Sequence, residues 1–164
     1  HKPVGLVCSH DSGEGPRVYD LLPERWLKRN PKVTTVGRLD KDTSGLLLLT
    51  DQGELVQRLT SPKSHLDKVY LASLNREPPA GAPEAFAHGL ELWDEGRLLK
   101  TLPASLRPLG GNRVEVTLRE GKYHQVRRMF AALGMQVLTL ERIRFGEWSL
   151  GELAPGTWRA LPLP

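Results

Sequence analysis

Asp40 is the residue of this sequence whose surroundings are best suited to chemistry. It ends the segment Gly37-Arg38-Leu39-Asp40 and precedes Thr43-Ser44-Gly45 and the apolar run Leu46–Leu49. A carboxylate and an arginine on a glycine-bounded turn before a buried strand are costly to desolvate unless the fold uses them. Such a carboxylate can act as a nucleophile or a general base. From these residues alone, a turn aspartate making Asx-type hydrogen bonds is an equally good interpretation.

A second cluster of charged residues lies far downstream, in the segment 120–129. Apolar residues at positions i, i+3, i+4 and i+7 predict a helix over 123–133, with Gly134 as its C-cap: Val126, Met129, Phe130 and Leu133. At about 100° per residue, Arg127 lies at the flank of that apolar stripe, whereas Arg128 points away from it, toward solvent or a phosphate. We therefore expect Arg127 to be half buried beside an anion, for which Asp40 is a candidate. Two solvated helix arginines are the alternative.

The segment Asp40-Lys41-Asp42-Thr43 also resembles the aspartate pair of haloacid-dehalogenase-like phosphatases. Their motif, D-x-D-x-[TV], has its threonine or valine one residue later, where Ser44 stands. Their motif also follows an apolar parallel strand, whereas here the preceding segment, 33–38, is short and polar. The sequence shows neither a downstream phosphate loop nor a carboxylate pair for Mg²⁺, so we reject this interpretation. The glycines form no Walker or dinucleotide-binding fingerprint.

Composition restricts the function classes further. The 164 residues are 39% apolar and 26% charged, as in ordinary globular proteins. No run approaches the roughly 20 apolar residues of a membrane span. The single cysteine, Cys8, and five scattered histidines predict neither a disulfide nor a metal site, and they favour a cytoplasmic location. The net charge of +4 is compatible with a phosphate-bearing partner. Because the chain opens at His1 without an initiator Met, we expect a fragment or a trimmed product.

The elements that must position these residues follow from hydrophobic periodicity and turn signals. Three further helices are expected. The first covers 18–27 and is interrupted by Pro23, the second follows Asp51 as its N-cap, and the third covers 83–88. Strands are expected at 4–9, 46–50, 68–74, 91–93, 104–109, 113–118, 137–143 and 158–161. Many strands with few helices predict an α+β fold on a mostly antiparallel sheet. The Pro/Ala/Gly-rich segment 76–83 is the best candidate for a join between two subdomains.

The segment Gly37–Thr50 resembles the signature of the RsuA/RluA-type pseudouridine synthases. Similarity extends, in the family's order, through Lys2-Pro3, Lys68-Val69-Tyr70, Glu120–Phe130, Leu140–Gly146 and Leu153–Gly156. The resemblance implies the family's catalytic fold over residues 1–164, a mostly antiparallel mixed sheet flanked by helices and loops, with the active-site cleft across the sheet. It also implies an RNA uridine as substrate and no cofactor.

The resemblance further implies site residues. Asp40 matches the catalytic carboxylate, Tyr70 the active-site tyrosine and Arg127 the basic residue that pairs with the aspartate. Leu39 and Leu46 would wall the pocket, and Arg38 would fill the space left by a flipped-out base or hold a phosphate. The residues expected along the RNA path are Lys68, Lys122, His124, Gln125 and Arg128.

The Tyr123-His124 pair and the segment 61–65 make the chain most similar to the ribosomal small-subunit branch of the family. This similarity implies 16S ribosomal RNA as the partner, either alone or within a ribosomal assembly intermediate, and we expect a monomer. A 23S-directed enzyme of the same family and a non-catalytic RNA-binding module are the alternatives. Enzymes of the small-subunit branch carry an N-terminal S4-type RNA-binding domain, which we expect to be absent from this chain.

Overall fold

The computed structural model describes residues 1–162, with Asp94 described by its backbone only, and it consists of two compact units. The first unit combines His1–Ser64 with the segment that begins at Ser149, and the second is His65–Trp148. The chain therefore passes between the units at residues 64–65 and 148–149. The segment 76–83, expected to be the join, lies inside the second unit, where it connects a strand to a helix.

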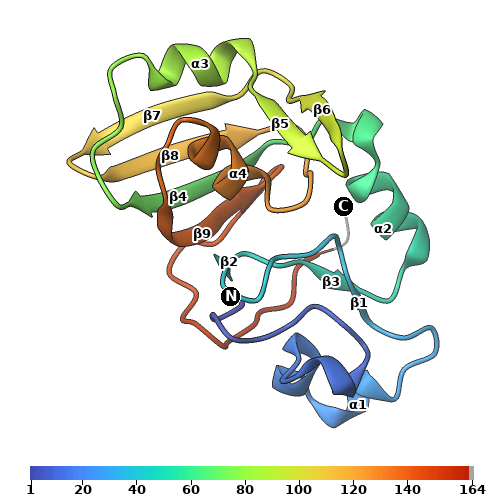
Figure 1. Ribbon diagram of the computed structural model, residues 1–164. Helices are drawn as coiled ribbons and strands as arrows, with labels where there is room; N and C mark the ends of the chain where they lie inside the picture. Colours follow the sequence, from blue (N-terminus) through green and yellow to red (C-terminus); the bar gives the residue numbers. More distant parts are fainter. Residues whose placement is uncertain (163–164) are drawn as a thin grey trace. The chain divides into compact units, whose positions relative to one another are not determined.

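The second unit is built on an antiparallel sheet in the order β9-β4-β8-β7 (Figure 1). Its strands are β4 (Lys68–Leu74), β7 (Ser105–Gly110), β8 (Arg113–Leu118) and β9 (Val137–Phe145), and the short β10 (Trp148–Ser149) follows β9 at the edge. Burial alternates along β8, where Val114, Val116 and Leu118 are buried and the residues between them are not. This period of two gives the sheet one apolar face.

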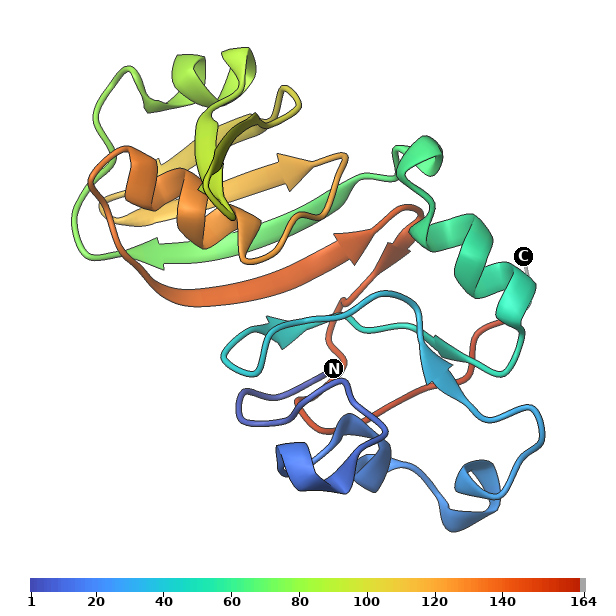
Figure 2. The same ribbon diagram turned by 45° about the vertical axis from the view of Figure 1, so that its right-hand side comes forward.

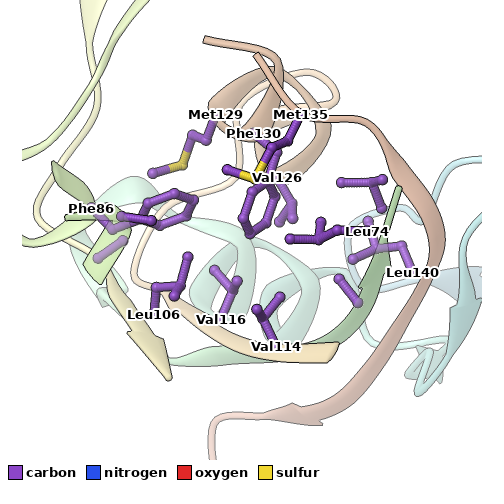
Figure 3. Packing of buried hydrophobic residues seen from close by; sticks show 14 of the residues in the cluster. Leu74, Phe86, Leu106, Val114, Val116, Val126, Met129, Phe130, Met135 and Leu140 are labelled. Carbon is purple, nitrogen blue, oxygen red and sulfur yellow. The ribbon is translucent and has the colours of Figure 1, made fainter. Parts of the chain in front are cut away.

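Two helices cover that apolar face, α3 (Ala82–His88) and α4 (Gln125–Ala132). Figure 3 shows Val126, Met129 and Phe130 of α4 meeting Val114, Val116 and Leu74 of the strands. Phe86 of α3 approaches Phe130 with ring centroids 5.0 Å apart. The apolar stripe predicted for the helix over 123–133 is therefore confirmed in α4, and it determines which face of α4 packs on the sheet.

A β-hairpin lies beside α4 in both views (Figures 1 and 2). It pairs β5 (Glu91–Asp94) with β6 (Arg97–Lys100), so that Leu92 stands opposite Leu99 and Trp93 opposite Leu98. Leu92 is buried in the core cluster. The sequence predicted β5 but missed β6, because the charged turn and the short strand give little periodic signal.

The first unit has little regular structure. Its helical elements are η1 (Ser12–Glu14), η2 (Val18–Leu21), α1 (Glu24–Leu27), α2 (Gly53–Thr60) and η3 (Pro62–Ser64). Its strands are β1 (Thr34–Thr35), β2 (Ser44–Gly45) and β3 (Leu49–Thr50), of which β1 and β3 pair antiparallel. The predicted break at Pro23 is confirmed, since η2 ends before it and α1 begins after it. The α-amino group of His1 donates to the carbonyl of Thr157 at 2.9 Å, which joins the two segments of the unit.

Several expectations for the first unit are wrong. Residues 4–9 form no strand: Val7 makes an isolated bridge to Arg17, and the chain turns at Gly5, whose φ is +97°. The apolar run reaches strand conformation only at β3, although Leu46, Leu47 and Leu48 are buried. Gln52 rather than Asp51 is the N-cap of α2, since Asp51 accepts a hydrogen bond from Nε of Arg29 at 2.6 Å.

Two observations complete the description. Residues 158–161 have no strand conformation. Within the part of the chain that the structure describes, no helix has both the length and the apolarity needed to cross a membrane.

Candidate active site

The turn that carries Asp40 is fixed at its backbone by residues from the start of the chain. The amide of Thr43 donates to the carbonyl of Asp40 at 3.1 Å, which closes a four-residue turn. Lys2 and Gly45 exchange main-chain hydrogen bonds of 2.8 and 2.9 Å, and the amide of Gly5 donates to the carbonyl of Lys41 at 2.7 Å. The backbone that follows Asp40 is thus held by the segment 2–5 at the start of the chain.

The side chain of Lys2 lies under this turn and is 2% exposed. Its ammonium donates to the carbonyls of Thr43 at 2.7 Å, Pro3 at 3.0 Å and Lys41 at 3.3 Å. Burial lowers the pKa of the Lys2 ammonium, while electrostatic interactions with Cys8, Asp42 and Asp40 oppose that shift. Lys2 was not predicted as a site residue. The Lys2-Pro3 pair within the family resemblance was the signal that could have identified it.

Other predicted residues of the first unit fall on or near the same turn. Arg38 is exposed and Asp40 half-buried, whereas Leu39 and Leu46 are buried at 6% and 7% exposure. The thiol of Cys8 donates to the carbonyl of Leu39 at 3.4 Å. The two leucines therefore anchor the turn in the apolar interior and leave the charged residues between them at its rim.

In the second unit, Tyr70 lies on β4 between Val116 of β8 and Arg142 of β9. The ring is half-buried and packs against the core cluster beneath α4. Because side chains two residues apart on a strand share a face, Lys68 continues the face that carries Tyr70. Tyr70 thus marks the place on this face where the apolar core gives way to cationic residues.

Lys68 and Arg142 form a cationic pair around Phe145. The Lys68 ammonium lies 5.3 Å from the Phe145 ring centroid, and the Arg142 guanidinium carbon lies 5.1 Å from it. Both distances permit cation–π attraction. Burial, together with the charge of Arg142, lowers the pKa of Lys68, and Asp67 and Glu120 act in the opposite direction. Arg142 is 3% exposed and was not predicted as a site residue.

The turn before α4 is organised by Glu120. Its carboxylate accepts from the Gln125 amide at 2.7 Å and the Leu102 backbone at 2.8 Å, and it forms an ion pair with Lys122. Burial alone would raise the pKa of Glu120, but the hydrogen bonds from Lys122, Leu102 and Gln125 lower it overall. Gln125 is 4% exposed, so its side chain serves this network. His124, the N-cap residue, has a left-handed backbone with φ +49°.

The two adjacent arginines of α4 have different surroundings. Arg127 is partly buried and its Nη1 donates to the carbonyl of Val137 at 3.1 Å. Arg128 donates to the carbonyl of Tyr123 at 3.1 Å and to that of Trp93. The half-buried position predicted for Arg127 is confirmed. The guanidinium of Arg128 folds back onto these two exposed carbonyls, and the phosphate contact expected for it stays a prediction.

The predicted site residues are divided between the two units. Arg38, Leu39, Asp40 and Leu46 belong to the first, and Lys68, Tyr70, Lys122, His124, Gln125, Arg127 and Arg128 belong to the second. Asp40 and Arg127 belong to different units, so their pairing stays a prediction. In the described residues, no group of three or more His, Cys, Asp and Glu side chains has an arrangement that could hold a metal ion.

Comparison with known proteins identifies the family. The family model for RNA pseudouridylate synthase matches residues 1–132. Over 98% of this chain, the ribosomal small subunit pseudouridine synthases A of Vibrio cholerae and Escherichia coli K12 are 46% and 43% identical, and 68% of each relative is covered.

Solved structures agree. A crystal structure of a pseudouridylate synthase superimposes with a TM-score of 0.90 at 42% identity, covering 98% of this chain and 67% of that one. The archaeal box H/ACA Nop10-Cbf5 complex shares the fold alone, with a TM-score of 0.57 at 23% identity over 92% of this chain and 48% of that chain. The resemblance seen in the sequence is therefore confirmed, and this chain belongs to the RNA pseudouridylate synthase family.

Proposed function

We propose that this protein isomerises a specific uridine of 16S ribosomal RNA to pseudouridine. The observation that carries the proposal is the agreement between the clamped Asp40 turn and the similarity, over 98% of the chain, to enzymes named ribosomal small subunit pseudouridine synthase A. We further propose that it acts as a monomer in the cytoplasm, on RNA alone or in an assembly intermediate. No second function is favoured by an observation of comparable weight.

Asp40 is proposed as the catalytic carboxylate. Catalytic groups must be held close to their productive geometry by a rigid surrounding shell. The turn meets this requirement, because Thr43 closes it and the Lys2 ammonium binds two of its carbonyls. The Asp40 side chain is half-buried, so it is reachable from solvent. This combination of a fixed backbone and an accessible carboxylate supports chemistry over the turn-capping interpretation.

Tyr70 and Arg127 are proposed to complete the catalytic set. Tyr70 is half-buried on a rigid central strand, which suits a ring that stacks on the uracil. Arg127 is a part-buried cation anchored to the Val137 carbonyl. A guanidinium held in this way can pair with a carboxylate without losing much conformational entropy on pairing. We propose that its partner is Asp40.

The reaction conserves all atoms of the nucleoside. The bond from N1 of the uracil to C1′ breaks, the base rotates, and C5 bonds to C1′; the C5 proton then leaves and N1 gains a proton. Asp40 supplies the nucleophile or base, and no cofactor is required. Because a stacked base is out of reach, the uridine must first leave the stack. Arg38, which is exposed on the Asp40 turn, is proposed to fill the vacated space.

The remaining predicted residues are proposed to serve RNA binding or support. Lys68 and His124 are half-buried and are proposed to contact the phosphate backbone, which fixes position rather than sequence. Leu39 and Leu46 are proposed to exclude water from the reacting carboxylate. Lys122 and Gln125 are bound to Glu120, so we propose that they mainly shape the turn before α4.

The test compares two substitutions in one turn. Purified protein is incubated with 16S and 23S ribosomal RNA from a strain that lacks the gene, and pseudouridines are mapped in both. We expect one new pseudouridine in 16S RNA. Asp40→Asn should reduce turnover at least a hundredfold while RNA binding survives. Asp42→Asn, an exposed neighbour in the same turn, is the control and should retain activity.

The outcomes separate the alternatives. Modification of 23S RNA would redirect the proposal to the large subunit. Absence of any new pseudouridine would support the non-catalytic RNA-binding module. Normal turnover by Asp40→Asn would remove Asp40 from its proposed role.

A further inference from the structure

Two of the most exposed large side chains of the protein are aromatic and lie close to the start of α4. Trp93 on β5 is 68% exposed, and Tyr123 in the turn before α4 is 69% exposed. Exposing large aromatic surface to water is unfavourable, and such residues are enriched where a partner will cover them. Neither residue has a role in the reaction described above.

One guanidinium holds both residues. Arg128 donates through Nη1 to the carbonyl of Tyr123 at 3.1 Å and through Nη2 to the carbonyl of Trp93. The hairpin also packs directly against α4, as Figures 1 and 2 show. The backbones of the two aromatic residues are therefore fixed next to one another before any partner arrives. Pre-organisation of this kind lowers the entropic cost of binding.

The orientation of each ring is also constrained. The Tyr123 ring stacks on the His124 imidazole, with centroids 3.8 Å apart and planes inclined by 17°. Trp93 stands opposite Leu98, which is 51% exposed, while their neighbours Leu92 and Leu99 turn inward. Trp93 and Leu98 thus form the outer apolar face of the hairpin. We call Trp93, Leu98, Tyr123 and His124 the aromatic platform.

The charge around the platform favours a nucleic acid. Residues 119–128 contain four Arg or Lys and one acid, and in this segment Lys122 pairs with Glu120 and Arg119 pairs with Asp67. The hairpin, residues 91–100, contains three acids and two bases, so the two segments together carry a net charge of +2. Flat aromatic side chains beside cations are the usual surface for unpaired bases, since every base has a face that can stack.

We propose that the aromatic platform binds single-stranded RNA next to the target uridine, with one base stacked on Trp93 and another on Tyr123. The inference rests on the proposed function, because it takes the substrate to be RNA. Arg128 is then a positioning residue that aligns the two rings. The platform gives the second unit a way to grip unpaired nucleotides that is independent of the Asp40 turn.

The first experiment measures binding of a fluorescein-labelled, short, mixed-sequence single-stranded RNA to the protein in the Asp40→Asn background, where turnover is expected to be at least a hundredfold slower. Trp93→Ala and Tyr123→Ala should each weaken binding about tenfold, the loss expected when one stacked base is lost. Leu138→Ala, which removes an exposed side chain on β9, is the control and should bind as the parent does. Unchanged affinity in both aromatic variants would overturn the proposal.

Two further variants separate stacking from simple apolar contact. Trp93→Phe keeps a flat ring and should recover most of the affinity, whereas Trp93→Leu keeps apolar area without a ring and should not. Equal binding by Phe and Leu would indicate a surface for an apolar protein partner, and would overturn the proposal. An RNA with abasic positions should bind the parent as weakly as the intact RNA binds Trp93→Ala.

Failure of this inference is distinguishable from failure of the proposed function. If ribosomal RNA is modified normally while the aromatic variants bind like the parent, only the platform is disproved. If no pseudouridine forms, the binding comparison is still read in the same way.

Discussion

The ammonium of Lys2 and the carbonyl of Thr43 are joined by a buried hydrogen bond of 2.7 Å, across 41 positions of sequence. The same ammonium also binds the carbonyls of Pro3 and Lys41. A charged donor is thus placed under the turn that carries Asp40. Such hydrogen bonds are stronger than neutral ones, and their loss leaves buried acceptors without a donor.

Lys2→Met should keep the volume of the side chain and remove all three hydrogen bonds. We expect the free energy of unfolding to fall by about 1–3 kcal/mol, measured by urea denaturation. Turnover should fall as well, because the Asp40 backbone loses its support. Lys41→Met, an exposed neighbour, is the control and should stay within about 0.5 kcal/mol of the parent. Equal effects of the two substitutions would show that the clamp is unimportant.

Arg127→Ala and Arg128→Ala should affect different kinetic constants. Removing Arg127, the proposed partner of Asp40, should lower kcat by about a hundredfold or more. Removing Arg128 releases the carbonyls of Trp93 and Tyr123, so it should chiefly raise KM. Steady-state rates of pseudouridine formation on ribosomal RNA measure both constants. A loss of kcat of the same size in the two variants would contradict the distinction drawn from their surroundings.

Glu120→Gln should reveal a pH-dependent contribution to stability. The hydrogen bonds of Glu120 lower its pKa in the folded protein below the unfolded value of 4.5, despite the opposing effect of burial. A carboxyl of this kind stabilises the fold above its unfolded pKa, and the contribution disappears as the pH falls through its folded pKa. The parent should therefore exceed Glu120→Gln in unfolding free energy at neutral pH.

That excess should shrink as the pH is lowered below about 4.5, in urea titrations at a series of pH values. Glu84→Gln, at an exposed position on α3, is the control, because it shows how the unfolding free energy changes at low pH when a solvated carboxyl is removed. A difference between parent and Glu120→Gln that does not change with pH would argue against the ionised network.

Gly89→Ala should destabilise the connection between α3 and the hairpin. Gly89 has a φ of +78°, and a Cβ there would lie 2.4 Å from the carbonyl oxygen of Thr101. Gly96 has a similar φ of +83° with open space around it, so Gly96→Ala isolates the backbone strain of about 1–2 kcal/mol. The Gly89 variant should lose at least about 1 kcal/mol more, because the clash is with backbone. Thermal or urea unfolding of the pair measures the difference.

The sequence predicted the second unit better than the first. Val114, Val116 and Leu118 alternate, and Val126, Met129 and Phe130 follow a helical period, because each element buries one face against the other. In the first unit, Leu46 to Leu48 are buried without pairing as a strand. The apolar run therefore indicated correctly that these residues are buried, but it predicted a strand that is too long, because a loop can also be buried.

Asp40 and Arg127 were predicted as site residues from their local sequence patterns. The half-buried state of Arg127 is confirmed, whereas its pairing with Asp40 stays a prediction. Lys2 and Arg142 were missed because their burial depends on residues far away in sequence. The backward fold of the Arg128 side chain was not foreseen. A helical wheel shows in which direction a side chain leaves the helix, but not that its guanidinium will donate to a carbonyl of the hairpin.

The first unit has a consequence for how the protein is made. It consists of residues up to 64 and residues from 149, with the whole second unit between them. At translation speeds of about 5–20 residues per second, its two parts emerge from the ribosome roughly ten seconds apart. The second unit can fold during that interval, whereas the unit bearing Asp40 has to wait for its later part. The unit that bears the proposed catalytic carboxylate is therefore completed late in synthesis, and a nascent chain stalled before residue 149 should hold a folded sheet and a first unit that lacks the hydrogen bond from His1 to Thr157.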